Sequence, residues 1–174
     1  MNLRVLTLSA LLLVAHTLPA GAAEREQDED DFPRQWQELE VQFPKAPVRE
    51  NLLPLYVSAA SDNKFYIDGS SLSVGADQVI RYVMVVETPG GARNVTFEGM
   101  RCESRSRRIY GAGRLDGSWS KARNSDWVRI LDAYANRQHA ALFLEYFCPF
   151  GNSVRTAAEA RDALVRGGHP DVRR

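Results

Sequence analysis

The stretch from Val79 to Cys102 constrains the fold more than any other part of the chain. Residues 78–87 are apolar at successive positions, which is typical of an interior strand that is covered on both faces. Residues 88–91, Thr-Pro-Gly-Gly, predict a tight turn, because glycine adopts positive φ without steric cost. Residues 93–102 alternate between apolar and polar and predict the returning strand. The chain is therefore organised around an antiparallel hairpin.

Further strands precede and follow this hairpin. Short strands are expected at residues 55–59, 64–67 and 72–74, with turns at 61–63 and 68–71. Residues 108–114 predict the strand that completes a meander. Because the predicted strands come first and the predicted helices later, without alternation, the sequence indicates an α+β fold. We expect a single antiparallel sheet, a meander, with C-terminal helices packed on one face and one disulfide.

Three helices are expected in the C-terminal part. Trp127, Ile130, Leu131 and Tyr134 have the i, i+3, i+4, i+7 spacing of an amphipathic helix. The same spacing recurs across residues 137–148. Residues 156–166 form the third predicted helix, with Thr156 and Glu159 as a capping box.

The segment before the sheet predicts an arm that crosses the domain. Residues 32–54 contain four prolines, which interrupt regular structure and favour extended backbone. Trp36, Leu39 and Phe43 have helical spacing and predict one short helix within this arm. We expect the arm to bury Trp36 and Phe43, either as a lid or as a cover for a sheet edge.

The N-terminus predicts export. Residues 1–4 carry one positive charge, residues 5–15 are apolar but too short to span a bilayer, and small residues follow at 20–23. We therefore expect a signal peptide at 1–23, an acidic disordered leader at 24–35, a single α+β domain at 36–168 and a flexible tail at 169–174. The mature protein is expected in the periplasm, with no transmembrane segment after cleavage.

The two cysteines of the chain, Cys102 and Cys148, are expected to form a disulfide. Their number is even, and an exported protein meets an oxidising environment. No Cys-x-x-Cys motif indicates a redox centre, and neither cysteine has histidines at metal-ligand spacing. We expect no metal and no cofactor.

The most suggestive surface is basic. Between residues 101 and 123, seven basic side chains stand against two acidic ones, although the whole chain has a net charge of zero. Arginine forks match carboxylates and phosphates, and aromatic side chains can stack beside them. The candidate binding residues are Arg101, Arg105, Arg107, Arg108, Arg114, Tyr110, Trp119 and Trp127. The expected partner is an anionic envelope component or an acidic protein, and export argues against nucleic acid. The alternative is a solvated hairpin paired with the acidic leader or with Glu40 and Glu50.

Signals for catalysis are weak. His139 and His169 are the histidines of the predicted mature chain, and no assembled hydrolase or nucleotide-binding motif accompanies them. We expect His169 in the tail and His139 on a helix, bonded to backbone or acting as an acid–base group. Asp68, Glu87 and Glu98 are candidates for a carboxylate pair. No residue is assigned a catalytic role.

Short motifs spread over most of the predicted domain match the pattern of one protein family. They are Arg81-Tyr82, Pro89-Gly90-Gly91-Ala92, Asn94-Val95, Glu98-Gly99-Met100-Arg101-Cys102, Asp116-Gly117-Ser118-Trp119, Asn136, Tyr146-Phe147-Cys148-Pro149 and Leu164-Val165-Arg166-Gly167-Gly168. This pattern resembles the CNP-one-like family of exported proteobacterial proteins, from about Trp36 to Gly168. The resemblance implies a small exported domain and transfers no catalytic residue.

Three functional hypotheses follow. The first is a non-enzymatic binding or interaction module of the cell envelope that uses the basic surface. The second is a small-ligand-binding protein with an aromatic and arginine pocket, lined by residues such as Tyr82, Tyr110, Trp119 and Trp127, although such aromatics are more often core. The third is a hydrolase that uses His139.

Overall fold

A computed structural model of the chain describes residues 35–133 and 137–172. The contacts divide the chain between Gln35 and Trp36, and the fold described below is that of the unit from Trp36 onward. The predicted signal peptide and all but the last residue of the predicted leader lie outside the described residues. No helix among the described residues is long and apolar enough to cross a membrane.

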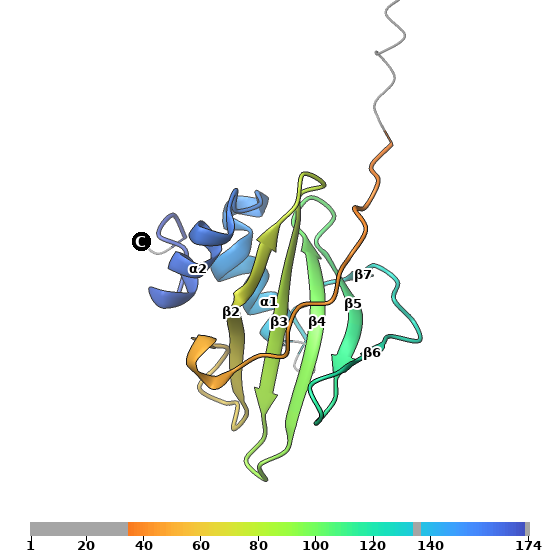
Figure 1. The fold of residues 1–174 in the computed structure, drawn as a ribbon. Helices are drawn as coiled ribbons and strands as arrows, with labels where there is room; N and C mark the ends of the chain where they lie inside the picture. The colour runs from red at the N-terminus through yellow and green to blue at the C-terminus, as the bar shows by residue number, and fades with distance from the viewer. Residues whose placement is uncertain (1–34, 134–136, 173–174) are drawn as a thin grey trace, which may run out of the picture. The chain divides into compact units, whose positions relative to one another are not determined.

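The described strands form one antiparallel sheet in which sequence neighbours are also spatial neighbours (Figure 1). Its order is β1-β2-β3-β4-β5-β6, and β7 pairs with the start of β5, whereas β6 pairs with the end of β5. The strands are β1 (Leu52–Leu55), β2 (Lys64–Val74), β3 (Val79–Glu87), β4 (Arg93–Arg101), β5 (Ser106–Gly113), β6 (Trp119–Lys121) and β7 (Val128–Arg129). The hairpin predicted from the sequence is β3–β4, in unbroken register from Val79 opposite Arg101 to Glu87 opposite Arg93. The predicted meander is confirmed.

The C-terminal helices cover one face of this sheet (Figure 1). They are α1 (Arg137–Ala141), the π-helical segment η3 (Leu142–Phe147) and α2 (Ala157–Val165), with short 3-10 turns at η1 (Arg49–Asn51) and η4 (Pro149–Gly151). Apolar side chains of the helices and of alternate strand positions, such as Tyr82 and Met100, share one buried cluster. This confirms the predicted α+β arrangement.

The predicted disulfide joins the two layers. Cys102 follows β4, Cys148 follows η3, and their sulfur atoms are 2.01 Å apart. Both residues are buried in the cluster between sheet and helices. The capping box of α2 is also present, since Thr156 Oγ1 accepts a hydrogen bond from the Glu159 N–H. The Glu159 carboxylate in turn accepts from the Arg155 N–H.

The opposite face of the sheet is covered by the arm, residues 36–48, which crosses β3 and β4 in Figure 1. Val41 and Phe43 pack there on a second buried cluster formed by Val83, Val85, Phe97 and Tyr110. The double-sided apolar pattern of β3 is thus explained by helices on one side and an arm on the other. The arm covers a face of the sheet and neither of its edges.

The helix predicted within the arm is absent, and this prediction was wrong. Residues 36–48 have neither helical nor strand structure. The side chains that attach the arm are Trp36, Glu38 and Phe43, whereas Leu39, which the helical spacing would bury, is 48% exposed. The expected burial of Trp36 was also wrong, because its side chain stays 36% exposed while its indole N–H is bonded. An extended chain advances about 3.3 Å per residue, roughly twice the rise of a helix, and so reaches anchors that lie far apart on the sheet.

The helix predicted to begin at Trp127 is also absent from the described residues. Residues 128 and 129 pair with β5 as strand β7, and the Ile130 N–H donates to the Arg105 carbonyl. Ile130 enters the core while Leu131 is 60% exposed, and Tyr134 lies outside the described residues. The helical spacing misled because Trp127 turns toward the arm and does not share a face with Ile130.

Two smaller predictions were wrong at element boundaries. Residues 68–71 do not turn the chain but lie within β2, at a register irregularity where the Asp68 carboxylate accepts from the Ser70 N–H. The first strand ends at Leu55 and does not start there.

His169, expected in a loose tail, is buried, and its backbone N–H donates to the Glu145 carbonyl.

Candidate functional site

A buried ion pair ties the arm to the start of β3. The Asp77 carboxylate accepts hydrogen bonds from the Arg81 guanidinium at 2.6 and 3.1 Å and from the Leu39 N–H of the arm at 2.9 Å. The Asp77 carbonyl accepts from the Trp36 indole N–H at 2.9 Å. Burial raises the pKa of Asp77, but the bonds from Arg81 and Leu39 outweigh it and the net direction is downward.

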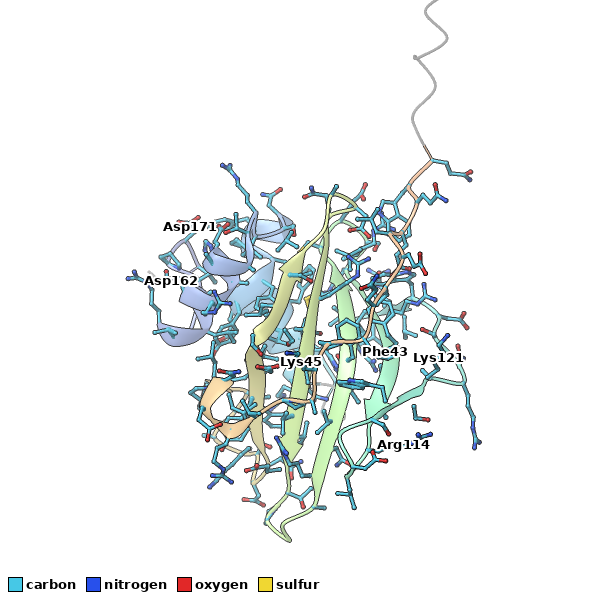
Figure 2. The ribbon with its side chains drawn as sticks, in the orientation of Figure 1. Phe43, Lys45, Arg114, Lys121, Asp162 and Asp171 are labelled. Atoms are coloured by element: carbon cyan, nitrogen blue, oxygen red, sulfur yellow. A yellow bond between two sulfur atoms is a disulfide. The ribbon has the colours of Figure 1, made fainter. Side chains whose placement is uncertain are left out.

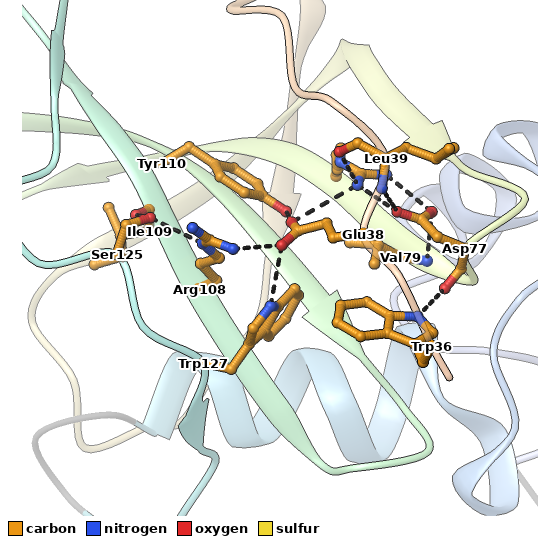
Figure 3. A network of polar contacts seen from close by, with 11 residues as sticks. Trp36, Glu38, Leu39, Asp77, Val79, Arg108, Ile109, Tyr110, Ser125 and Trp127 are labelled. Carbon is orange, nitrogen blue, oxygen red and sulfur yellow. Dashed lines mark hydrogen bonds and ion pairs between the residues drawn. The ribbon is translucent and has the colours of Figure 1, made fainter. Parts of the chain in front are cut away.

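The centre of the arm is the carboxylate of Glu38, which is surrounded by donors from the sheet (Figure 3). It accepts hydrogen bonds from Arg108, from the Tyr110 hydroxyl at 2.6 Å and from the Trp127 indole N–H at 3.2 Å. Arg81 adds an ion pair at 3.8 Å. Burial and the bond to Glu38 raise the pKa of Tyr110 well above its usual range, so this hydroxyl acts as a donor. We call these four donors, Arg81, Arg108, Tyr110 and Trp127, the Glu38 cradle.

Aromatic contacts hold the arm on both sides of Glu38. Trp36 meets Trp127 edge to face at 6.0 Å, and the Arg101 guanidinium lies 3.7 Å from the Trp36 ring centre. Phe43 stacks on Trp119 at 5.7 Å, and the Trp119 indole N–H donates to the Pro44 carbonyl at 2.7 Å. Such pairs typically contribute about 0.5–1.5 kcal/mol beyond the area they bury.

A cleft of about 480 Å³ opens between the arm and the β5–β6 side of the sheet. It is lined by Glu38, Leu39, Val41, Phe43, Arg108, Tyr110, Lys121, Ala122 and Ser125. The arm wall carries the apolar side chains of Leu39, Val41 and Phe43 beside the Glu38 carboxylate, while the other wall carries basic and hydroxyl groups. The Arg108 side chain is 31% exposed here, and the Lys121 side chain makes no ion pair or hydrogen bond with the described residues. The cleft thus combines an apolar wall with two cations.

The predicted arginines do not form one surface, because the strand period of two divides them. Arg101 and Arg108 lie on the arm face, where they contact Trp36 and Glu38. Arg107 lies opposite Met100 on the helix-covered side. Arg105 donates to the Ile130 carbonyl and approaches the Phe143 ring, also on the helix side. Arg114 is exposed in the β5–β6 turn.

The predicted aromatics are divided in the same way. Tyr82 is completely buried on the helix side and bonded to Glu98, so it lines no pocket with the other three. Tyr110 lines the cleft, whereas Trp119 and Trp127 are engaged by Phe43, Trp36 and Glu38 of the arm and do not line it.

His139 lies in the core with an acidic partner. Its Nε2 atom is 2.8 Å from Glu98 Oε2, and the two side chains are 5% and 3% exposed. Burial raises the pKa of Glu98, but His139 and the Thr96 hydroxyl bond lower it, and the net direction is downward. A substrate cannot reach this pair without opening the core, so the geometry gives no support to a hydrolase at His139. Asp68, Glu87 and Glu98 form no carboxylate pair within the described residues.

No group of three His, Cys, Asp or Glu side chains among the described residues is arranged to hold a metal ion. The Nε2 atom of His169 lies 3.2 Å from the Glu159 carboxylate on α2, so this histidine joins the residues after α2 to the helix.

Sequence reasoning missed Glu38, Asp77 and Arg81, the polar residues that fix the arm. One signal for them was available, because Arg81 stands inside an otherwise apolar strand. A buried arginine requires an acidic partner, and this requirement predicts a carboxylate packed against β3. Which carboxylate it is depends on the path of the arm, which local patterns do not contain.

Comparisons with known proteins agree with the motif pattern of the sequence. The sequence profile of the CNP1-like family matches residues 31–165. The chain belongs to the CNP1-like family. It is 25% identical over 191 residues to "Cryptic neisserial protein 1" of Neisseria gonorrhoeae (strain ATCC 700825 / FA 1090), with 95% of this chain and 94% of that protein covered. No solved structure matches the chain.

Proposed function

We propose that this CNP1-like chain is an exported, non-enzymatic binding module that takes an anionic group of a cell-envelope component in the cleft beside the arm. The observation that carries this proposal is the pairing of an apolar wall with the cations Arg108 and Lys121 in one cleft. Anionic groups with apolar neighbours match such a lining, because the cations attract the charge while the apolar side chains contact the rest of the ligand. The apolar N-terminal run, followed by small residues, supports the export part of the proposal.

Lys121 is the residue to test, because Arg108 also holds the arm in place. A Lys121→Glu change places a negative charge in the cleft without removing a side-chain hydrogen bond or ion pair within the described residues. Arg114→Glu is the matched control, an equal charge reversal on the same β5–β6 hairpin but outside the cleft. Figure 2 shows Lys121 and Arg114 at separate places on this hairpin.

Two labelled probes, poly-glutamate and vesicles of phosphatidylglycerol, are titrated with the mature protein at low salt. We expect Lys121→Glu to weaken binding of at least one probe about tenfold and Arg114→Glu to change it less than about twofold. Binding should also weaken when ionic strength rises, since charges in an open cleft are screened. Failure of both probes to bind, or equal losses in the two variants, refutes the proposed contact.

Export is tested separately by expressing the full chain and sequencing the N-terminus of the periplasmic form. We expect it to begin after Ala22 or Ala23. A full-length cytoplasmic product would contradict the export part of the proposal.

The second candidate is a protein that binds a small anionic ligand in the same cleft. The observation in its favour is the volume of about 480 Å³, which lies in the range of small-molecule sites. A small carboxylate or phosphate ester that raises the melting temperature of the wild-type protein, while both polymeric probes fail, favours this candidate.

A further inference from the structure

The carboxylate of Glu38 is held in the manner in which proteins hold a ligand. Its hydrogen-bond partners are two side chains of β5 and an indole N–H just before β7, and Arg81 of β3 adds an ion pair. The Glu38 side chain is 13% exposed. Hydrogen bonds in which one partner is charged are about twice as strong as neutral ones, so the cradle is a strong carboxylate site.

The sheet backbone is shaped around this cradle. A Cβ atom at Gly99 would lie 2.3 Å from the Tyr110 hydroxyl oxygen, which donates to Glu38. A Cβ atom at Gly75 would lie 2.2 Å from Oδ1 of Asp77 and 2.8 Å from Nη1 of Arg81, so Gly75 leaves room for this ion pair. Two positions without side chains therefore make room for two of the four donors, which is the mark of a built site.

The cradle also has donor capacity that Glu38 does not use. Nε of Arg81 is buried and has no hydrogen-bond partner within the described residues. If the arm left, Arg81, Arg108 and Lys121 would face the single negative charge of Asp77. The sheet beneath the arm is therefore cationic in its own right and attracts another carboxylate.

The arm is attached in a way that permits exchange. It adds no strand to the sheet and is fixed by side chains and by backbone bonds to Asp77 and Trp119. Its last residues include Pro44 and Pro47, and the chain enters the sheet only after η1, at β1. A segment of this kind competes with an outside segment through its high effective concentration.

We propose that Glu38 is an internal ligand, and that the Glu38 cradle is a recognition site for an extended acidic segment of a partner protein. This inference goes beyond the proposed function, because the partner segment occupies the face that the arm covers and not the cleft beside the arm. In this chain the cradle holds the side-chain carboxylate of Glu38, which lies two residues after Trp36 and five before Phe43. The site therefore recognises an acidic residue between two aromatic anchors. The partner segment carries the same pattern and replaces the arm.

The experiment uses the full mature chain with Glu38→Ala, which empties the cradle. Glu40→Ala is the matched control, because Glu40 is an exposed acid two residues further along the same arm. The probe is a fluorescein-labelled peptide with the sequence of residues 35–45, and a second peptide carries Glu38→Gln. Fluorescence anisotropy reports binding of each peptide to wild type and to both variants.

We expect the peptide to bind the Glu38→Ala chain about tenfold or more tightly than wild type and Glu40→Ala, since the arm no longer competes for the cradle. The Glu38→Gln peptide should bind at least about tenfold more weakly than the unchanged one, because it offers no carboxylate. Acetate at high concentration should compete with the peptide.

Equal binding of the two peptides, or no difference between the Glu38→Ala and Glu40→Ala chains, overturns the proposal. Binding of dodecyl phosphate in place of the peptide overturns the choice of an acidic protein segment and favours a lipid headgroup. If Glu38→Ala does not fold, recovery of its folded fraction in acetate, compared with equal chloride, supports the cradle, and no recovery refutes it. If Lys121→Glu does not weaken binding of either anionic probe, the proposed function is refuted. If Lys121→Glu weakens probe binding but Glu38→Ala does not change peptide binding, this inference alone is refuted.

Discussion

Adding one methyl group to the sheet should loosen the arm. A Cβ atom at Gly111 in β5 would lie 2.6 Å from Cε1 of Phe43 and 2.7 Å from the Ser120 carbonyl oxygen. Real Cβ atoms do not approach other atoms so closely, so Gly111→Ala forces one of these neighbours to move. Phe43 can move, because it belongs to an arm without strand pairing. Ser120 is held in place, because it lies in β6 and is paired with β5. The Phe43 ring would leave the stack with Trp119 and the contact with Phe97, which lies 5.8 Å away.

The magnitude follows from what the Phe43 ring buries. Truncating a fully buried phenylalanine costs about 3–5 kcal/mol of folding free energy, and Phe43 is half-buried, so Phe43→Ala should cost about 2 kcal/mol. Gly111→Ala should cost about 2–3 kcal/mol, because the displaced ring loses the same contacts and the Ser120 oxygen adds strain. In a chain that already carries Phe43→Ala, the same change should cost about 1 kcal/mol.

Urea unfolding, followed by circular dichroism and by tryptophan fluorescence, measures these free energies. The control is Gly90→Ala in the β3–β4 turn, where a Cβ atom would meet nothing closer than Thr88 Oγ1 at 4.0 Å. A coupling of about 1–2 kcal/mol between Gly111→Ala and Phe43→Ala identifies the ring as the obstacle. Equal costs in both backgrounds would show that the clash is with β6, and a cost below about 0.5 kcal/mol would show that the arm does not lie there.

Three further predictions concern the layer on the other face. Replacing Cys102 and Cys148 with alanine should cost about 4 kcal/mol in urea unfolding and raise its m-value, since the cross-link spans a sequence separation of 46; a loss under about 1 kcal/mol contradicts it. Glu98→Gln should cost about 3 kcal/mol near neutral pH, because it breaks a buried pair with His139. The folded pKa of Glu98 lies below its usual value of 4.5, so the stability that its charge provides is present above about pH 4.5 and is lost as pH falls through the folded pKa. The variant should therefore show a shallower loss of stability below pH 4.5, and identical acid profiles would refute this. Thr156→Ala should lower stability by about 1 kcal/mol through loss of the α2 cap, whereas Thr156→Ser should lower it much less.

Patterns that depend on close neighbours in sequence predicted the fold well. The apolar run of β3 and the Pro-Gly-Gly turn fix the central hairpin, because strand pairing across a short turn leaves little freedom of register. The cap at Thr156 is equally local. The disulfide followed from the number of cysteines and the expected compartment, and no long-range geometry was needed.

Patterns that depend on distant partners failed. Trp36, Leu39 and Phe43 fit a helix in isolation, yet the arm is extended because Asp77 and Trp119 bond its backbone and the cradle bonds Glu38. The candidate site was predicted in part, since Arg108 and Tyr110 were chosen, but their acidic partner comes from a segment some seventy residues earlier. The arginines that are close in sequence were expected to form one surface, but they lie on both faces of the sheet because successive side chains of a strand point to opposite faces.

The two covers of β3 differ in kind, and this difference indicates where the protein can change. The helix layer is held by a continuous apolar cluster and a disulfide at Cys102, neither of which is weakened by ionic screening. The arm is held by the hydrogen bonds and ion pairs of Asp77 and Glu38 together with a few partly buried apolar side chains. Layers with few buried apolar contacts open at lower free energy than the core. Opening of the arm face exposes cations and aromatic rings, whereas opening of the helix face would destroy the fold, so binding that depends on a conformational change belongs on the arm face.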